Sequence, residues 1–333
     1  MKEKNIDINH ARRIAIAPMM DWTDRHYRYF MRLISKNCML YTEMITTGAL
    51  LKGKDAARFL DHHKDEYPLT LQLGGNNPKD LAKCAKLAEN HGYDEVNINV
   101  GCPSDRVSSG QFGLSLMSKP ELVAEAVAEM KSTASIPVSV KTRTGFDHQD
   151  SFEQLQYFIT LLDQAQTDYI CIHARKGWLS GLNPKENRTI PPLNYDTVYQ
   201  IKALFPHVKI GINGGITTLK DAEEHLTKVD SVMIGRQAYQ TPYLFSDVDQ
   251  RFYNKKNHVL SRMEIMENFM PYVEKELKNG TRLHHITRHI LGLFQGVPGA
   301  RQFRRYLSEH APTINDIQIL KNALKLIESS EVA

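Results

Sequence analysis

The chain has 333 residues, of which 41% are hydrophobic and 24% charged, and its formal net charge is +4. This composition is ordinary for a globular protein and excludes a largely disordered chain. The longest apolar runs are the length of strands, far short of the roughly 20 residues that cross a bilayer, so a helical membrane protein is also excluded. The length predicts one large domain and a smaller one.

The compartment is predicted from the start of the chain and from the cysteines. Residues 1–13 carry charges of both signs and no apolar core, so we expect no signal peptide. The four cysteines form neither a CxxC pair nor a metal-type spacing with histidine. We therefore expect a reduced cytoplasmic protein without disulfides or a metal site. We also expect a monomer with no membrane partner.

Short β-branched or apolar segments recur along the first 240 or so residues, with helical segments in most of the gaps between them. The segments are 13–17, 39–42, 69–73, 95–100, 138–141, 169–173, 208–212 and 231–234. Helices are expected at 78–89 and 120–131, each with a proline in its first turn, where the missing N–H does no harm. Eight such repeats predict a closed TIM (β/α)8 barrel over residues 1–244. A doubly wound open sheet is disfavoured because no GxGxxG follows the first strand and because the count reaches eight.

The rest of the chain, residues 245–333, is predicted to form a smaller all-α domain. Helical periodicity occurs at 263–278, 282–294 and 317–327. Five arginines gather between residues 281 and 310: Arg282, Arg288, Arg301, Arg304 and Arg305. Guanidinium groups suit phosphate because their planar fork bonds two oxygens at once. The alternative is that they form an ordinary solvated helix face.

In a TIM barrel, the chemistry lies at the carboxyl ends of the strands. Polar residues or glycines follow all eight predicted strands. The last two ends carry Asn213-Gly214-Gly215 and Gly235-Arg236, where barrels commonly bind a phosphate group. Tight turns that merely need glycine are the alternative.

Other strand ends narrow the choice of ligand. Hydrogen-bonding side chains on separate strands are expected to face one cavity: Gln72, Asn97, Lys141 and His173. Ala17-Pro18-Met19 adds a flat apolar floor. This set suits a planar ring with polar edges, such as the isoalloxazine of a flavin, whose reduced anion a lysine would stabilise. Lys141 could instead form a Schiff base, an option with which the neighbouring Arg143 is compatible.

The segment 96–100 reads as a buried strand that leads into the corner Gly101-Cys102-Pro103. A cysteine thiol has an ordinary pKa of about 8.5 and is therefore mostly protonated at neutral pH, so Cys102 could donate a proton next to a reduced flavin. Asn99, near the same mouth, could hold a substrate ring. The alternative is that Cys102 is a small apolar packing residue.

Several segments together resemble the tRNA-dihydrouridine synthases, and within them the A subfamily, which acts at positions 20 and 20a. The general matches are 17–25, 71–74, 96–104, 140–145, 172–175, 212–215 and 234–236. Two further segments, 181–192 and 296–305, look specific to the subfamily. The likeness covers nearly the whole chain.

The resemblance implies reduction of the uracil 5,6 double bond in the D-loop of tRNA, with hydride passing from reduced FMN to C6 and a proton from Cys102 to C5. NADPH is the implied reductant. The implied FMN ligands are Pro18, Met19, Gln72, Lys141, His173, Asn213, Gly214, Gly215, Gly235 and Arg236. The implied tRNA contacts are Asn99, Lys185, Arg188, Arg301 and Arg304.

Two other functions share part of this pattern. A small-molecule flavin oxidoreductase of the dihydroorotate dehydrogenase or ene-reductase type would have the same barrel and phosphate site, but it leaves the arginine-bearing tail without a role. An RNA-binding module with a degenerate barrel would explain the tail, but it leaves the intact strand ends without one.

Overall fold

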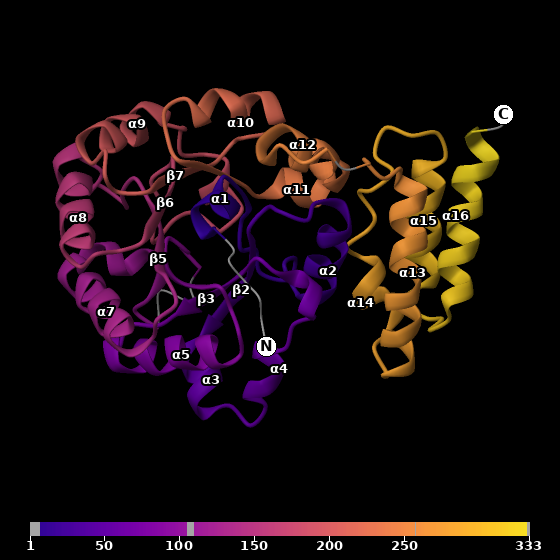
Figure 1. The fold of residues 1–333 in the computed structure, drawn as a ribbon, viewed down its shortest axis with the longest axis horizontal. Coiled ribbons are helices and arrows are strands. Elements are labelled where there is room, and N and C mark those ends of the chain that lie inside the picture. The colour runs from indigo at the N-terminus through magenta and orange to yellow at the C-terminus, as the bar shows by residue number, and fades with distance from the viewer. Residues whose placement is uncertain (1–6, 105–109, 257, 332–333) are drawn as a thin grey trace. The chain divides into compact units, whose positions relative to one another are not determined.

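The computed structural model describes residues 7–104, 110–256 and 258–331, and the chain divides into two compact units (Figure 1). The first unit comprises Met1–Met20 and Cys38–Gly235. The second unit comprises Asp21–Asn37 and Arg236–Ala333.

The first unit is built on eight parallel strands in the order β1-β8-β7-β6-β5-β4-β3-β2. The strands are β1 (Ile14–Ile16), β2 (Leu40–Thr46), β3 (Leu69–Gly74), β4 (Glu95–Val100), β5 (Val138–Arg143), β6 (Tyr169–His173), β7 (Ile210–Asn213) and β8 (Ser231–Ile234). A parallel bridge between Ala15 and Met39 joins β1 to the residue before β2. There the N–H of Ile16 donates to the carbonyl of Met39 at 2.9 Å. The sheet therefore closes on itself, which confirms the predicted TIM barrel.

Helices surround these strands (Figure 1). The surrounding helices are α3 (Thr47–Lys52), α4 (Ala56–Leu60), α5 (Pro78–Asn90), α7 (Pro120–Thr133), α8 (Phe152–Gln164), α9 (Tyr195–Leu204) and α10 (Leu219–Leu226), with short 3-10 helices at Lys64–Glu66, Gly113–Ser118 and Glu186–Arg188. The short helix α1 (Ile8–Arg12) lies in the middle of this ring. Their starts follow local sequence rules. Asn77 caps α5 by accepting from the Asp80 N–H, and Pro78 occupies the first turn. Ser151 and Gln154 form a capping box at α8.

Alternate residues of each strand point into the barrel, where they form layers. The deepest layer is largely apolar and comprises Ala11, Ala15, Ala17, Met39, Tyr41, Tyr169, Cys171 and Met233. Within it the Tyr169 hydroxyl and the Ser231 Oγ are hydrogen-bonded at 2.8 Å. A Cβ at position 211 would lie 2.0 Å from the Tyr169 hydroxyl oxygen, so only glycine leaves room for this bond. The barrel interior is thus a packed core.

The second unit is helical. Its helices are α2 (Arg25–Ile34), α11 (Arg236–Gln240), α12 (Val248–Tyr253), α13 (Arg262–Lys278), α14 (Leu283–Thr287), α15 (Ala300–His310) and α16 (Ile317–Glu331), with a 3-10 helix at Pro242–Asp247. Asp249 of α12 holds the residues that follow α2, because its carboxylate accepts from Ser35 Oγ at 2.6 Å and from the Lys36 N–H at 2.7 Å. The rings of Tyr29 and Tyr272 stack with centroids 4.0 Å apart.

These units differ from the predicted division at residue 244 in two ways. The second unit begins at Arg236, and it also takes the segment Asp21–Asn37 from between β1 and β2. The contacts responsible join residues more than 200 positions apart, such as Arg25 Nη2 and Glu276 Oε2 at 2.5 Å. The helix predicted over 282–294 is shorter than expected, since α14 ends at Thr287 and turns follow it.

No helix in the described part of the chain is long and apolar enough to cross a membrane.

Candidate functional site

The inward-facing side chains at the carboxyl ends of β5, β6 and β7 form the floor of the candidate site. Parallel pairing sets Arg143 beside His173, and His173 beside Asn213. The Lys141 ammonium donates to Asn213 Oδ1 at 3.2 Å. Burial lowers the pKa of Lys141, and the nearby charge of Arg143 adds to the shift. The structure therefore brings together three of the predicted ligands, Lys141, His173 and Asn213. Lys141 is largely shielded from water.

The turn after β7 has a backbone that requires glycine. Gly214 and Gly215 have φ of 116° and 71°, in the left-handed region. A Cβ at Gly214 would lie 2.6 Å from Cδ2 of His173. The carbonyl of Gly214 accepts from the Tyr195 hydroxyl at 2.8 Å, a contact with no signal in the sequence. The turn is therefore a fixed, bare stretch of backbone beside His173.

The other predicted phosphate-side residues follow β8 and β1. A Cβ at Gly235 would lie 3.6 Å from Cβ of Ala17 and 3.9 Å from Sδ of Met19, so this position has ordinary room. Pro18 and Met19 are half-buried in the segment after β1. Arg236 is the first residue of α11 and belongs to the second unit.

Cys102 lies on a corner whose backbone is held by a side chain of its own strand. Asn99 Oδ1 accepts from the N–H of Gly101 at 3.1 Å and from the N–H of Cys102 at 3.0 Å. The Cys102 carbonyl accepts from the Leu114 N–H at 3.0 Å. Of the four cysteines, all within the described residues, Cys102 alone is partly exposed. The corner, here defined as Gly101 and Cys102, thus presents a fixed, accessible thiol.

Arg143 holds the same corner from the other side. Its Nε donates to the carbonyl of Gly101 at 2.8 Å, and its Nη1 donates to the carbonyls of Lys176 and Asn187 at 3.0 and 3.1 Å. Burial lowers the pKa of this guanidinium to about 10. Sequence reasoning placed Arg143 on the rim but missed this role, because no residue spacing marks backbone carbonyls as the partners.

The loop after β6 carries two of the predicted tRNA contacts. Lys185 and Arg188 are exposed; Lys185 precedes the 3-10 turn Glu186–Arg188, and Arg188 is its last residue. Asn187 between them is fully buried and ties the loop to itself, accepting from the Trp178 N–H at 2.7 Å and donating to the Leu182 carbonyl at 3.0 Å. The buried Asn187 thus holds the loop from which Lys185 and Arg188 extend into solvent.

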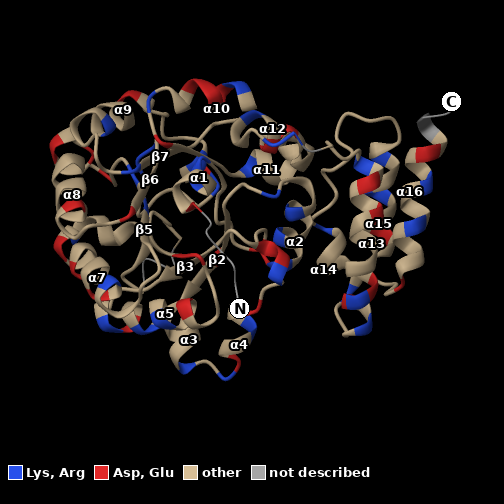
Figure 2. Ribbon diagram, viewed as in Figure 1, with Lys and Arg blue, Asp and Glu red and all other residues tan. Residues whose placement is uncertain are grey.

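The remaining predicted contacts lie on α15 of the second unit. Arg301 is exposed, and Arg304, one turn later, donates to Gln295 Oε1. Arg305 on the same helix is paired with Glu309 at 2.8 Å, and Arg288 is paired with Asp24 at 2.7 Å. Figure 2 shows basic and acidic residues together on α13, α15 and α16. Part of the arginine cluster is therefore locally neutralised.

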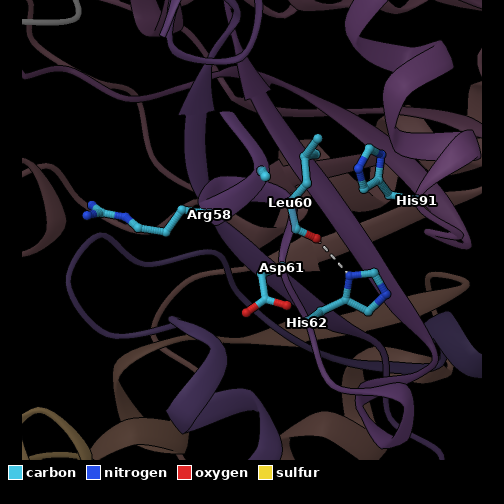
Figure 3. A pocket seen from close by; sticks show the side chains of 6 residues that line it. Arg58, Leu60, Asp61, His62 and His91 are labelled. Atoms are coloured by element: carbon cyan, nitrogen blue, oxygen red, sulfur yellow. Dashed lines mark hydrogen bonds between the residues drawn. The ribbon is translucent and has the colours of Figure 1, made fainter. Parts of the chain in front are cut away.

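A separate hollow of about 440 Å³ is lined by Ala57, Arg58, Leu60, Asp61, His62 and His91 (Figure 3). These residues precede β3 and β4 in the chain, so the hollow lies toward the amino-terminal edge of the barrel. Both ring nitrogens of His62 are engaged, with the Leu60 carbonyl at 2.9 Å and the Tyr67 hydroxyl at 2.6 Å. This hollow is not the candidate site, because the chemistry of TIM barrels occurs at the opposite edge, at the carboxyl ends of the strands.

Among the described residues, no group of three or more histidine, cysteine, aspartate or glutamate side chains is arranged to hold a metal ion.

The closed barrel, with its lysine, histidine, glycine turn and thiol at one rim, defines a TIM-barrel protein with a candidate active site at the carboxyl ends of its strands. Solved structures share the fold. A 2-naphthoyl-CoA reductase complex aligns with a TM-score of 0.57 at 10% identity over 72% of this chain and 50% of that one. An old yellow enzyme homologue from Zymomonas mobilis aligns with a TM-score of 0.52 at 14% identity over 74% of this chain and 89% of that one.

The chain belongs to the dihydrouridine synthase family, whose model matches residues 15–328. Curated relatives of similar length carry the name tRNA-dihydrouridine(20/20a) synthase. The relative from Shewanella oneidensis is 55% identical over 99% of this chain and 97% of its own. Those from Escherichia coli K12 and Vibrio cholerae are 54% and 53% identical, each over 98% of this chain and over 94% and 99% of their own. The family resemblance expected from the sequence motifs is thereby confirmed.

Proposed function

We propose that this protein reduces uridine to 5,6-dihydrouridine in the D-loop of tRNA, at positions 20 and 20a, using FMN as cofactor and NADPH as reductant. The observation that carries the proposal is the Cys102 thiol, partly exposed on a corner held by Asn99 and Arg143. Family membership and the names of the full-length relatives support the substrate.

The residues at the rim fit a flavin mononucleotide. The bare turn Gly214-Gly215 offers backbone without side chains to a phosphate group, and Arg236 would add positive charge. Lys141, with its lowered pKa, and His173 suit the polar edge of a planar ring. The other proposed ligands are Pro18, Met19, Gln72, Asn213 and Gly235. When bound, FMN would supply a hydride to C6 of the uracil ring, having received its own from NADPH.

The chain's own residues supply the proton for C5 and hold the uracil base in place. Cys102 acts as general acid and gives its thiol proton to C5. Asn99 has both acceptor positions of Oδ1 occupied by the corner, so its predicted contact with the base would use the second hydrogen of Nδ2. The positive charge of Lys141 would stabilise the negative charge of a reduced flavin bound beside it.

We assign tRNA binding to cations on the loop after β6 and on α15. Lys185 and Arg188 extend from a loop anchored by Asn187, and Arg301 and Arg304 share one face of α15. Side chains of this kind contact the phosphate backbone while a target base leaves its stack. We propose that the enzyme works as a cytoplasmic monomer.

The test is to map dihydrouridine in tRNA from a strain that lacks the gene. We expect dihydrouridine to disappear at positions 20 and 20a, to persist elsewhere, and to return when the wild-type gene is restored. An unchanged map, together with NADPH oxidation by the purified protein on small unsaturated carbonyl compounds without tRNA, would instead establish a small-molecule flavin oxidoreductase.

A further inference from the structure

A continuous line of hydrogen bonds runs through the barrel from the corner to a buried carboxylate. Asn99 Nδ2 donates to Gln72 Oε1 at 2.9 Å, and Gln72 Nε2 donates to Asn97 Oδ1 at 2.8 Å. Asn97 Nδ2 then donates to Ser139 Oγ at 2.8 Å, and Ser139 Oγ donates to Glu95 Oε1. We call the side chains of Asn99, Gln72, Asn97 and Ser139 the amide relay.

The lower end of the relay is a fixed acceptor. Glu95 is fully buried, and the Arg12 Nε donates to its Oε2 at 2.6 Å. The Tyr41 hydroxyl donates to Oε1 at 3.2 Å. Burial lowers the pKa of Arg12, but the combined effect of Glu95, Tyr41 and Tyr169 is larger and raises it. Arg12 is therefore a permanent cation, and the Glu95 carboxylate, which has a donor on each oxygen, serves as an acceptor.

This acceptor determines which way every amide in the relay faces. Because Glu95 only accepts, Ser139 must spend its single hydrogen on Glu95 and offer a lone pair to Asn97. Asn97 therefore turns its Nδ2 to Ser139 and its Oδ1 to Gln72. Gln72 in turn directs its Nε2 to Asn97 and its Oε1 to Asn99. Asn99 therefore directs its Nδ2 to Gln72 and its Oδ1 to the corner.

The upper end demands the same direction. The N–H groups of Gly101 and Cys102 can only donate, so the corner needs an oxygen, which Asn99 provides. Reversing any one amide would set two donors or two acceptors against each other inside the barrel, where unpaired polar groups are costly. The relay is buried: Asn97 and Ser139 are 0% exposed, Gln72 is 1% exposed, and Asn99 at its upper end is 9% exposed.

We propose that Glu95 is a positioning residue, which acts through Ser139 to orient the amides that hold the Cys102 corner and present Gln72. The link to the reaction rests on the proposed function, whereas the control of the corner does not.

The experiment replaces Ser139 with alanine in the full-length, flavin-loaded protein, which removes the oxygen joining Glu95 to the amides. The matched control is Ser231→Ala, a buried serine on β8 that bonds Tyr169 outside the relay. Two readouts report on the corner and not on turnover: the alkylation rate of Cys102 with iodoacetamide and the hydrogen exchange of the amides of Gly101 and Cys102. The other three cysteines are buried, and a Cys102→Ser sample supplies the blank for alkylation.

We expect Ser139→Ala to raise both rates roughly 3- to 10-fold, the change in local opening that loss of one hydrogen bond brings. Ser231→Ala should leave both rates within about twofold of the wild type at a similar loss of thermal stability. Equal effects of the two substitutions, or none from Ser139→Ala, would overturn the proposal.

A second measurement needs no variant and guards against a failure of Ser139→Ala to fold. In the wild-type protein, nuclear Overhauser effects between the Nδ2 hydrogens of Asn97 and the β-hydrogens of Ser139 are expected. Nδ2 hydrogens of Asn97 directed toward Gln72 instead would overturn the proposed orientation.

Turnover separates the two proposals. If Ser139→Ala loosens the corner and also lowers kcat on tRNA with an unchanged KM, the relay serves the proposed reaction. If the corner loosens in a protein that forms no dihydrouridine even as wild type, the positioning role of Glu95 stands and the proposed function fails.

Discussion

At the residue scale, the chemistry depends on how firmly one thiol is held. Asn99 binds the N–H groups of the corner and Arg143 binds the carbonyl of Gly101, so the backbone on the amino side of the Cys102 thiol is fixed on both its donor and acceptor sides. A proton donor needs this control, because proton transfer is efficient only over a short distance range. The thiol itself contacts Ser104 Oγ at 3.6 Å.

Replacing Cys102 with alanine should retain the yellow flavin and lower turnover on tRNA roughly 10²- to 10⁴-fold, the range expected for a lost general acid. Flavin absorbance and dihydrouridine formation measure the two effects. The control is Cys84→Ala, which removes a buried thiol that lies on helix α5 and not on a strand end, and it should leave turnover within about twofold. Unchanged turnover in Cys102→Ala would remove this residue from the mechanism.

Replacing Arg143 with lysine should lower the free energy of unfolding by about 2–4 kcal/mol, because an ammonium cannot reach three carbonyls that a fork serves together. Denaturant unfolding measures the loss. Arg13→Lys, at an exposed position next to β1, is the control and should change stability by less than about 0.5 kcal/mol. Equal stability of the two variants would show that the carbonyl contacts of Arg143 contribute little.

The sequence predicted these residues unevenly. Lys141, His173 and Asn213 could be placed together because strand ends of a barrel converge by geometry. The functions of Arg143 and Asn187 could not be predicted, since their partners are backbone carbonyls and amides that carry no residue identity. The sequence singled out Asn99 but could not predict that its Oδ1 accepts from the N–H groups of both Gly101 and Cys102.

At the element scale, strands were predictable and connections were not. The alternation of β4 and the proline-started helices α5 and α7 follow from local rules. The periodic pattern over 282–294 predicted one helix, but the structure ends α14 at Thr287. Beyond it Gly292 faces the carbonyl of Gln240, and a Cβ there would lie 2.3 Å from this oxygen, so tertiary packing overrides the local pattern.

The turn that follows β7 and leads to α10 gives a prediction for a single added methyl group. Gly214→Ala should weaken FMN binding by about tenfold or more, because the new Cβ would meet the His173 ring and φ of 116° is strained for alanine. Flavin titration of the apoprotein measures the affinity. Gly48→Ala on α3 is the control, since a Cβ there meets no described atom within 4 Å. Equal affinity in both variants would place the flavin phosphate elsewhere.

At the scale of the whole molecule, the two units are expected to divide the work between chemistry and substrate binding. The double variant Arg301→Ala with Arg304→Ala should weaken tRNA binding, reduce the salt dependence of binding by about one unit of slope per residue, and leave NADPH oxidation near normal. Filter binding at several salt concentrations measures this. Arg305→Ala is the control on the same helix, because its charge is already paired with Glu309. Loss of NADPH oxidation in the double variant would assign these arginines to the fold or to the flavin site.

The second unit should be the acid-sensitive part of the molecule. Burial lowers the pKa of His26 to about 4, and its Nδ1 lies 2.8 Å from the Tyr272 hydroxyl. Below pH of about 6.5 the unfolded chain takes up a proton at His26 that the folded chain does not, so stability falls with pH from about 6.5 to about 4. We expect a loss of about 2 kcal/mol between pH 7 and pH 5 from this histidine. Denaturant unfolding of the wild type and of His26→Phe at both pH values measures it, and an identical pH dependence of the two would contradict the assignment.

The division of the molecule could be predicted only in part. Composition and repetition indicated a barrel followed by helices. The membership of α2 in the second unit depends on pairs such as Arg25 with Glu276 and Asp24 with His289, which no local pattern reveals.

The segment Asp21–Asn37 makes the second unit discontinuous in sequence, and this limits how the protein can be dissected or recombined. A stop codon after the barrel would remove the partners of α2 and expose Phe30, Met31 and Tyr27, which are now buried. Grafting the C-terminal helices onto another barrel would likewise leave them without α2. A functional transplant of the second unit therefore needs two inserts, one of them placed between the first and second strands of the recipient, and ribosomal synthesis completes this unit only when nearly the whole chain has emerged.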